Sequence, residues 1–362
     1  MNIVTNTRHT RHHLIATLVL AAVTLTFHGW SLRDGLFLDD HWHRIQLEHG
    51  GWSLADLIDA STIEPAEFIH TWWQDRPVRW QYPRPFAMLV MKSMHHLTGG
   101  NVAAQHAVNI LLHLTNVLLV YTLCLLLTRR VFWSTVAGLL LAVYSHSFTS
   151  VAWLAAQNAL LQTTLMLAAL LCYIRASGLI CHPLCERARP DQSPPLRMRP
   201  YFAALMLWCL AVASRENALV APAIFASFDL AFGGRRHLWK RRWALAPFIA
   251  LAAAWAVWRL ANFDPMPDVY FRRPDGPGYL LWLAVKLLHY LTSAIWHSPM
   301  TVGPSGRYNP LSEVPGDCLL MLVIVAVMSV GYYLAARRAR GWWIWPLWIL
   351  LGVLPVLPVM AT

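Results

Sequence analysis

Long apolar stretches recur along the whole 362-residue chain, and this pattern constrains the fold more than any other feature. A helix needs about 20 apolar residues to cross the hydrocarbon layer of a bilayer with its backbone hydrogen bonds satisfied. The chain is 57% hydrophobic and only 13% charged, which is too apolar for a water-soluble fold of this length. The sequence therefore predicts an all-α, polytopic bundle of transmembrane helices.

The apolar stretches predict about nine spans. The first has a basic flank but lacks a small-residue cleavage site, so we interpret it as an uncleaved span rather than a signal peptide. The expected spans are Leu14 to Leu32, Val102 to Leu127, Val131 to Tyr144, Val151 to Ile174, Tyr201 to Ala213, Ala218 to Phe232, Trp243 to Ala261, Cys318 to Ala335 and Trp342 to Val359.

Basic residues give an independent check on this topology, because Lys and Arg concentrate in short cytoplasmic loops. The formal charge of +11 is thus a sign of membrane orientation, and no nucleic-acid partner is expected. A full span at Tyr279 to Trp296 would move a basic cluster outside, so this segment is expected to lie on the outer surface or to re-enter. The clusters that fall on one side are Arg8/Arg11, Arg129/Arg130, Arg175 to Arg199, Arg235 to Arg242 and Arg337 to Arg340.

The whole chain, residues 1–362, is expected to form a single transmembrane domain. Residues 33–101 form a long, Trp-rich first extracytoplasmic loop, in which Leu54 to Asp59 and Arg84 to Leu97 are predicted juxtamembrane helices. Residues 175–200 are rich in Pro and Arg, which is typical of a cytoplasmic linker.

The local feature most suggestive of chemistry is Phe37-Leu38-Asp39-Asp40-His41-Trp42, just after the first span. Adjacent carboxylates at a membrane boundary are costly to desolvate, so they are expected to face water, a cation or a substrate. In a glycosyl transfer, Asp39 or Asp40 would accept the proton of an acceptor hydroxyl, and the pair is also the candidate site for a divalent cation. The alternative is an acidic loop with no catalytic role.

Charged residues elsewhere are candidates for substrate contacts. Arg215 and Glu216 lie between two short spans, where charges are expensive unless they pair with one another or line a cavity. Arg84 lies between two prolines in the first loop and is a candidate phosphate clamp, or an arginine that reaches toward the interface.

Polar residues also recur within the second span, where the spacing places four of them on one helix face. Hydrogen bonding between helices explains this stripe at least as well as substrate binding. His146, at the outer end of the third span, raises the same question and is retained as a candidate substrate-binding residue. The stripe comprises His106, Asn109, His113 and Asn116.

Four stretches in this order resemble the GT-C class of membrane glycosyltransferases, in particular the protein O-mannosyltransferase-like branch often fused to tetratricopeptide repeats. They are FLDDHW, the segment from Tyr82 to Tyr121 with its Tyr-Pro-Arg-Pro start, Ala137 to Gln162, and SRENALVAPAIFASFDLAF from Ser214. The likeness extends from about Gly29 to the end of the chain. It implies a polyprenyl-phosphate sugar donor, chemistry at the outer face with inversion at the anomeric carbon, and Asp39 or Asp40 as the base.

The chain also departs from the family pattern. No basic residue follows Trp153, and Arg215 replaces the family's lysine, which retains the charge and permits bidentate phosphate contact. No repeat array follows, so the chain is expected to be a short member or to lack a C-terminal portion.

These observations predict a glycosyltransferase that moves a hexose, mannose-like, from a polyprenyl-phosphate donor to a hydroxyl of a protein, glycan or lipid acceptor. The expected location is a bacterial-type inner or plasma membrane, with the active site extracytoplasmic. The alternatives are a transporter or flippase of lipid-linked sugar and an inactive membrane scaffold. The candidate substrate-binding residues are Arg84, His146, Arg215, Glu216 and Arg273.

Overall fold

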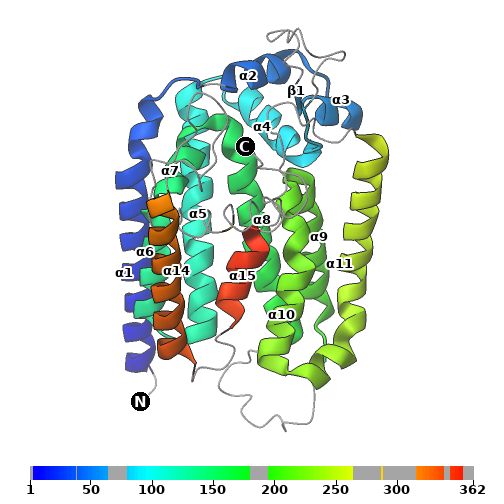
Figure 1. Cartoon of the computed structure of the whole chain (residues 1–362). Helices are drawn as coiled ribbons and strands as arrows, with labels where there is room; N and C mark the ends of the chain where they lie inside the picture. The colour runs from blue at the N-terminus through cyan, green and yellow to red at the C-terminus, as the bar shows by residue number, and fades with distance from the viewer. Residues whose placement is uncertain are drawn as a thin grey trace. The chain divides into compact units, whose positions relative to one another are not determined.

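A computed structural model describes residues 3–37, 39–63, 80–179, 195–263, 287, 315–337 and 343–353. Nearly all of these residues lie in helices, which confirms the predicted all-α class (Figure 1). Besides the helices, the described residues form two short strands, β1 (Thr62–Ile63) and β2 (Trp80–Gln81), which pair with each other. The predictions for Arg273 and for most of the segment Tyr279 to Trp296 lie outside the described residues.

The chain forms two compact units, Met1–Ile63 with Gln81–Ala221, and Glu64–Trp80 with Pro222–Thr362. That the chain acts as one domain stays a prediction. The helices of the first unit are α1 (Ile3–His28), η1 (Gly29–Arg33), α2 (Asp40–His49), α3 (Leu54–Asp59), α4 (Pro85–Leu97), α5 (Val102–Thr128), α6 (Val131–Ala142), α7 (Ser145–Ala152), η3 (Leu154–Ala156), α8 (Gln157–Ser177), α9 (Met198–Ser214) and η5 (Glu216–Val220). The second unit contains α10 (Ala221–Gly233), α11 (Arg235–Asn262), α14 (Pro315–Ala336) and α15 (Ile344–Val353).

Several helices are long and apolar enough to cross a membrane, which indicates a membrane protein. Among the described residues four qualify singly, Thr10–Arg33, Val102–Thr128, Leu154–Ser177 and Arg235–Asn262, and a bent pair brings the number to five. Shorter apolar helices such as Met198–Ser214 do not qualify, because 17 residues extend only about 26 Å. The total of about nine spans stays a prediction.

The bent pair consists of α6 and α7. The sequence predicts only one span here, Val131 to Tyr144, without the short helix α7 that follows. Helix α6 ends at Ala142, and the chain turns by 60° into α7. Tyr144 adopts an extended conformation at the start of α7, and the Ser147 N–H donates to the Tyr144 carbonyl as the new helix begins. The expected fourth span starts later than Val151, because η3 precedes α8. His146 therefore lies in the first turn of a separate short helix.

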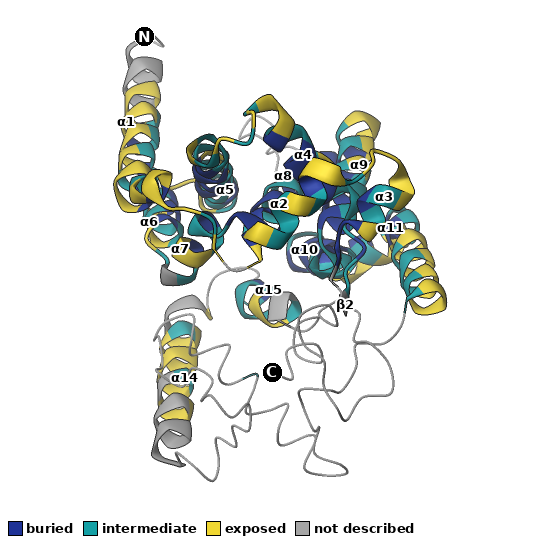
Figure 2. Cartoon of the chain, turned by 90° about the horizontal axis from the view of Figure 1, so that it is seen from above, coloured by how far each residue is buried: buried dark blue, intermediate teal, exposed yellow. Residues whose placement is uncertain are grey.

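Helix α5 packs against α1, α6 and α8 and forms the centre of the first unit (Figure 2). Leu20, Val117, Tyr121 and Ala142 make up one of its buried apolar clusters. A Cβ on Gly138 would lie 2.8 Å from Leu20 Cδ2, so a larger residue on α6 there would force the Leu20 side chain of α1 to shift. Small residues at helix contacts are typical of membrane bundles.

Helices α2, α3 and α4 lie across one end of α8 and α9 (Figure 1). A capping box between Ser53 and Asp56 starts α3, and Pro85 occupies the first turn of α4. The buried Lys92 ammonium of α4 donates to the carbonyls of Gly50 and Gly51 where α2 ends. Helices α3 and α4 lie where two helices were predicted within residues 33–101; that they belong to a juxtamembrane extracytoplasmic loop stays a prediction.

Candidate functional site

The two adjacent aspartates lie in different environments. Asp40 is 3% exposed, and its Oδ1 and Oδ2 accept the N–H groups of Ala155 and Phe37 at 2.7 and 2.9 Å. Burial raises the pKa of Asp40 above its usual value, although these backbone hydrogen bonds oppose the rise. Asp39 is exposed at the N-cap of α2, where its side chain makes no capping hydrogen bond. Asp40 is thus a positioned, more basic carboxylate.

Arg84 and Glu216, 132 residues apart in the chain, form a two-point ion pair. Arg84 Nη2 lies 2.9 Å from Glu216 Oε1, and Arg84 Nε lies 3.3 Å from Oε2. The Arg84 guanidinium also lies over the Tyr82 ring, 4.6 Å from its centroid. Burial acts to raise the pKa of Glu216, but the charges of Arg84 and Arg215 and the Arg84 hydrogen bond lower it overall. Glu216 is therefore ionised at neutral pH.

A second guanidinium, that of Arg215, lies within electrostatic reach of Arg84 and Glu216. Burial and the Arg84 charge lower the pKa of Arg215 from its ordinary, very high value. Arg215 Nη1 donates to Asn158 Oδ1 at 3.3 Å, whereas its buried Nε has no hydrogen-bond partner in the described part of the chain. Arg84 thus pairs with Glu216, whereas Arg215 adds a second positive charge that forms no ion pair with the described residues.

Asn158 links this charged group to Asp40. Its Nδ2 donates to the Ala155 carbonyl at 2.9 Å, and the N–H of the same Ala155 donates to Asp40. Helix α8 therefore connects the aspartate at the start of α2 with the arginine that follows α9. No local sequence pattern identifies this role of Asn158, because its partner Arg215 is 57 residues away.

His43 follows Asp40 by three residues on α2 and is a site residue that sequence reasoning missed. Its Nδ1 is buried and has no hydrogen-bond partner among the described residues. Burial, and then the Arg84 charge, lower the pKa of His43 to about 4, so the imidazole is neutral at pH 7. The Asp-x-x-His spacing is the sequence signal that His43 lies on the same face of α2 as Asp40, because residues three apart share a helix face.

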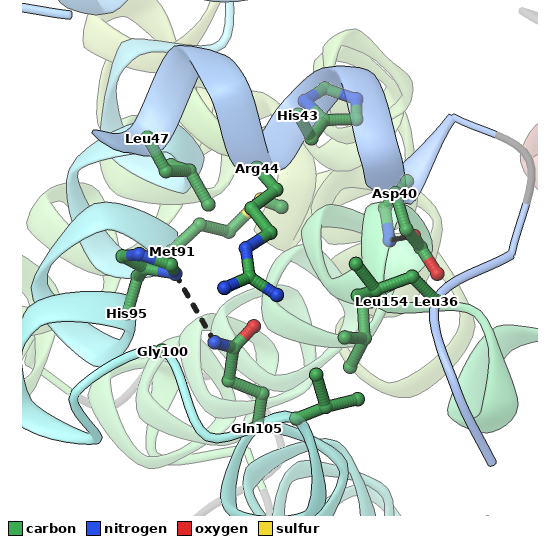
Figure 3. A pocket seen from close by; sticks show the side chains of 12 residues that line it. Leu36, Asp40, His43, Arg44, Leu47, Met91, His95, Gly100, Gln105 and Leu154 are labelled. Carbon is green, nitrogen blue, oxygen red and sulfur yellow. Dashed lines mark hydrogen bonds between the residues drawn. The ribbon is translucent and has the colours of Figure 1, made fainter. Parts of the chain in front are cut away.

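Asp40 and His43 line a small pocket of about 20 Å³, which has room for about one water molecule (Figure 3). One part of its lining is polar, and His95 Nδ1 there lies 3.3 Å from Gln105 Nε2. The rest is largely apolar. The full lining comprises Leu36, Asp40, His43, Arg44, Leu47, Met91, His95, Gly100, Val102, Gln105, Leu154 and Ala155.

The structure brings four of the predicted site residues into one network, namely Asp40, Arg84, Arg215 and Glu216. His146 contacts the Tyr144 ring at a centroid distance of 5.3 Å, and no contact described above joins it to this network. Within the described residues, no group of three or more His, Cys, Asp or Glu side chains is arranged to hold a metal.

The polar stripe of α5 is buried and joins helices. Asn109 Nδ2 donates to the Val151 carbonyl at 3.2 Å, and Asn116 Nδ2 donates to the Leu160 carbonyl at 3.1 Å. Asn116 also accepts from the Thr164 hydroxyl at 2.8 Å. These bonds favour the interpretation of the asparagines as contacts between helices.

Comparison with known proteins adds no identification. No family model matches the chain, and no curated protein and no solved structure shows detectable similarity to it.

Proposed function

We propose that the protein is a GT-C-like glycosyltransferase that takes a hexose from a polyprenyl-phosphate donor. The observation that carries the proposal is the network in which Arg84 pairs with Glu216 and the adjacent Arg215 connects through Asn158 and Ala155 to the positioned Asp40. Such a transfer requires a cation that holds the phosphate and a base that accepts a proton. Arg215 and Asp40 match these two roles.

The two arginines would hold the donor phosphate. Guanidinium groups bind phosphate oxygens through paired, charge-assisted hydrogen bonds, and buried examples lose little strength to solvent. Glu216 keeps Arg84 oriented, while the unpartnered Nε of Arg215 remains available for a phosphate oxygen. The positive charge would also stabilise the leaving phosphate as its bond to the sugar breaks.

Asp40, rather than Asp39, would be the base. Two backbone N–H groups fix its orientation, its pKa is raised, and it lines the pocket. In the transfer, the acceptor hydroxyl gives its proton to Asp40 and its oxygen bonds to the anomeric carbon. The bond between that carbon and the phosphate oxygen breaks, and its electron pair stays on the phosphate. Attack from the face opposite the phosphate inverts the anomeric centre.

The membrane placement completes the proposal. About nine spans would place the first loop and this network at the extracytoplasmic face of a bacterial-type plasma membrane. Nucleotide sugars are cytoplasmic, so chemistry at that face needs a sugar already carried across on a lipid. The acceptor would be a hydroxyl group of a protein, glycan or lipid.

The direct test is turnover by the purified full chain, reconstituted in vesicles and supplied with a panel of radiolabelled polyprenyl-phosphate hexoses. Transfer of label to a protein, glycan or lipid acceptor supports the proposal. Movement of the donor between leaflets without transfer would instead identify a flippase. Neither transfer nor movement with any donor would favour a scaffold.

A further inference from the structure

The first turns of α11, in the second unit, carry a dense group of exposed basic and aromatic side chains. Trp239 and Trp243 are 70% and 72% exposed, which is unusual for such large apolar rings. The Arg242 guanidinium lies over both rings, 4.4 Å from the Trp239 centroid and 5.3 Å from that of Trp243. Arg235, Arg236 and Lys240 are also exposed.

The opposite side of the same helix packs inward. His237 is buried and lies 3.9 Å from Asp229, and Phe248 contacts Phe225 at a centroid distance of 5.1 Å. Leu245 is buried on this side as well. The basic and aromatic side chains therefore project from the side of α11 that the second unit leaves uncovered, where Figure 2 shows exposed residues along the helix.

We propose that this group, Arg235, Arg236, Trp239, Lys240, Arg242 and Trp243, binds the headgroup of an anionic phospholipid. Helix α11 contains no acidic residue, and Arg235, Arg236 and Lys240 form no ion pair with the described part of the chain. Exposed cations without counter-charges are complementary to phosphodiester oxygens and attract anionic lipid surfaces.

The tryptophans identify a lipid rather than a soluble anion as the partner. Indole rings prefer the headgroup level of a bilayer, where an apolar body meets a polar edge. Along α11, Trp239 and Arg259 are separated by about 30 Å, which matches the thickness of the hydrocarbon layer. With Arg259 at one boundary, Trp239 and Arg242 lie at the other, and Arg235 and Arg236 extend into the headgroups. This site does not depend on the proposed transferase activity.

The test is retention of lipid by the full chain in native mass spectrometry. The protein is released from detergent in the presence of equal amounts of phosphatidylglycerol and phosphatidylcholine. Wild type is expected to retain phosphatidylglycerol, and the triple variant R235Q/R236Q/K240Q is expected to lose about tenfold or more of that preference, because each cation near an anionic surface contributes roughly fivefold.

A matched control separates a local site from overall charge. R129Q/R197Q/R199Q removes the same charge from three exposed arginines of the first unit and is expected to keep the preference. Because the triple variant risks misfolding, R235K/R236K keeps the charge and is expected to bind as wild type does. Any of three results would overturn the proposal. Wild type retains both lipids equally, the control variant loses the preference for phosphatidylglycerol as much as the triple variant does, or the lysine variant fails to bind.

Discussion

The first unit contains two polar regions, and they differ in charge: one is made of neutral side chains of α5, the other of arginines and a glutamate. On α5, the amides of Asn109 and Asn116 donate to backbone carbonyls of neighbouring segments. At the end of the bundle, Arg84 pairs with Glu216, and Arg215 Nε is left without a partner in the described part of the chain. Neutral amides hold helices together, whereas a half-buried arginine without a carboxylate partner is costly unless a ligand completes its contacts.

The largest expected effect separates the adjacent aspartates. Asp40→Asn should lower turnover about 10²- to 10⁴-fold, because an amide cannot accept the acceptor proton. Asp39→Asn should change turnover by less than about threefold, since that carboxylate is exposed and makes no capping bond. Initial rates of sugar transfer measure both. The reverse order of the two losses would make Asp39 the base and Asp40 a structural residue.

The second effect concerns the cationic half of the network. Arg215→Gln should weaken donor use, measured as kcat/KM, by roughly 30-fold, which corresponds to about 2 kcal/mol for a lost charge-assisted contact. Arg33→Gln is the control, because Arg33 is exposed and contacts the Trp30 ring outside the site. Equal losses in the two variants would show that net charge, rather than a phosphate contact, controls donor use.

The third effect tests the α5 stripe as a structural region. Asn116→Leu should lower the free energy of unfolding by about 1 to 2 kcal/mol, because it removes bonds to the Leu160 carbonyl and the Thr164 hydroxyl. Its neighbour Thr115 is exposed and bonds only within its own helix, so Thr115→Val should be nearly neutral. Thermal unfolding in detergent distinguishes the two. If Asn116→Leu keeps its stability but loses turnover, the stripe contributes to substrate binding instead.

The smallest effect is a pH dependence that arises from His43. Its pKa in the folded chain, about 4, lies below the usual 6.5, so the unfolded chain binds more protons between these values. Stability should therefore fall as the pH decreases from about 6.5 toward 4. The melting temperature of His43→Gln should depend less steeply on pH across this window, by a few degrees at most. An unchanged profile would contradict the burial of a neutral imidazole.

The sequence predicted the helical class and much of the site, for identifiable physical reasons. Apolar runs determined where α1, α5, α8 and α11 form, because each segment must satisfy its own backbone. Charges near membrane depth pointed to Arg215 and Glu216, and the structure pairs Glu216 with Arg84.

Other features depend on contacts that no local pattern encodes. Asp39 and Asp40 are neighbours in sequence, and what distinguishes Asp40 is its burial and the N–H that it accepts from Ala155, 115 residues away. The turn after Ala142 contains neither Pro nor Gly, so no helix-breaking residue predicts it. The pKa of His43 reflects burial and a charge contributed by another helix end.

The central claim is that Arg84 and Arg215 form a phosphate site, and equilibrium binding tests it without requiring the acceptor. The affinity of the full chain for a polyprenyl phosphate is compared with its affinity for the uncharged polyprenyl alcohol of the same length. We predict that wild type prefers the phosphate by about tenfold or more and that Arg215→Gln removes most of this preference. Equal affinity of wild type for phosphate and alcohol, or a preference that persists in the variant, would contradict the claim.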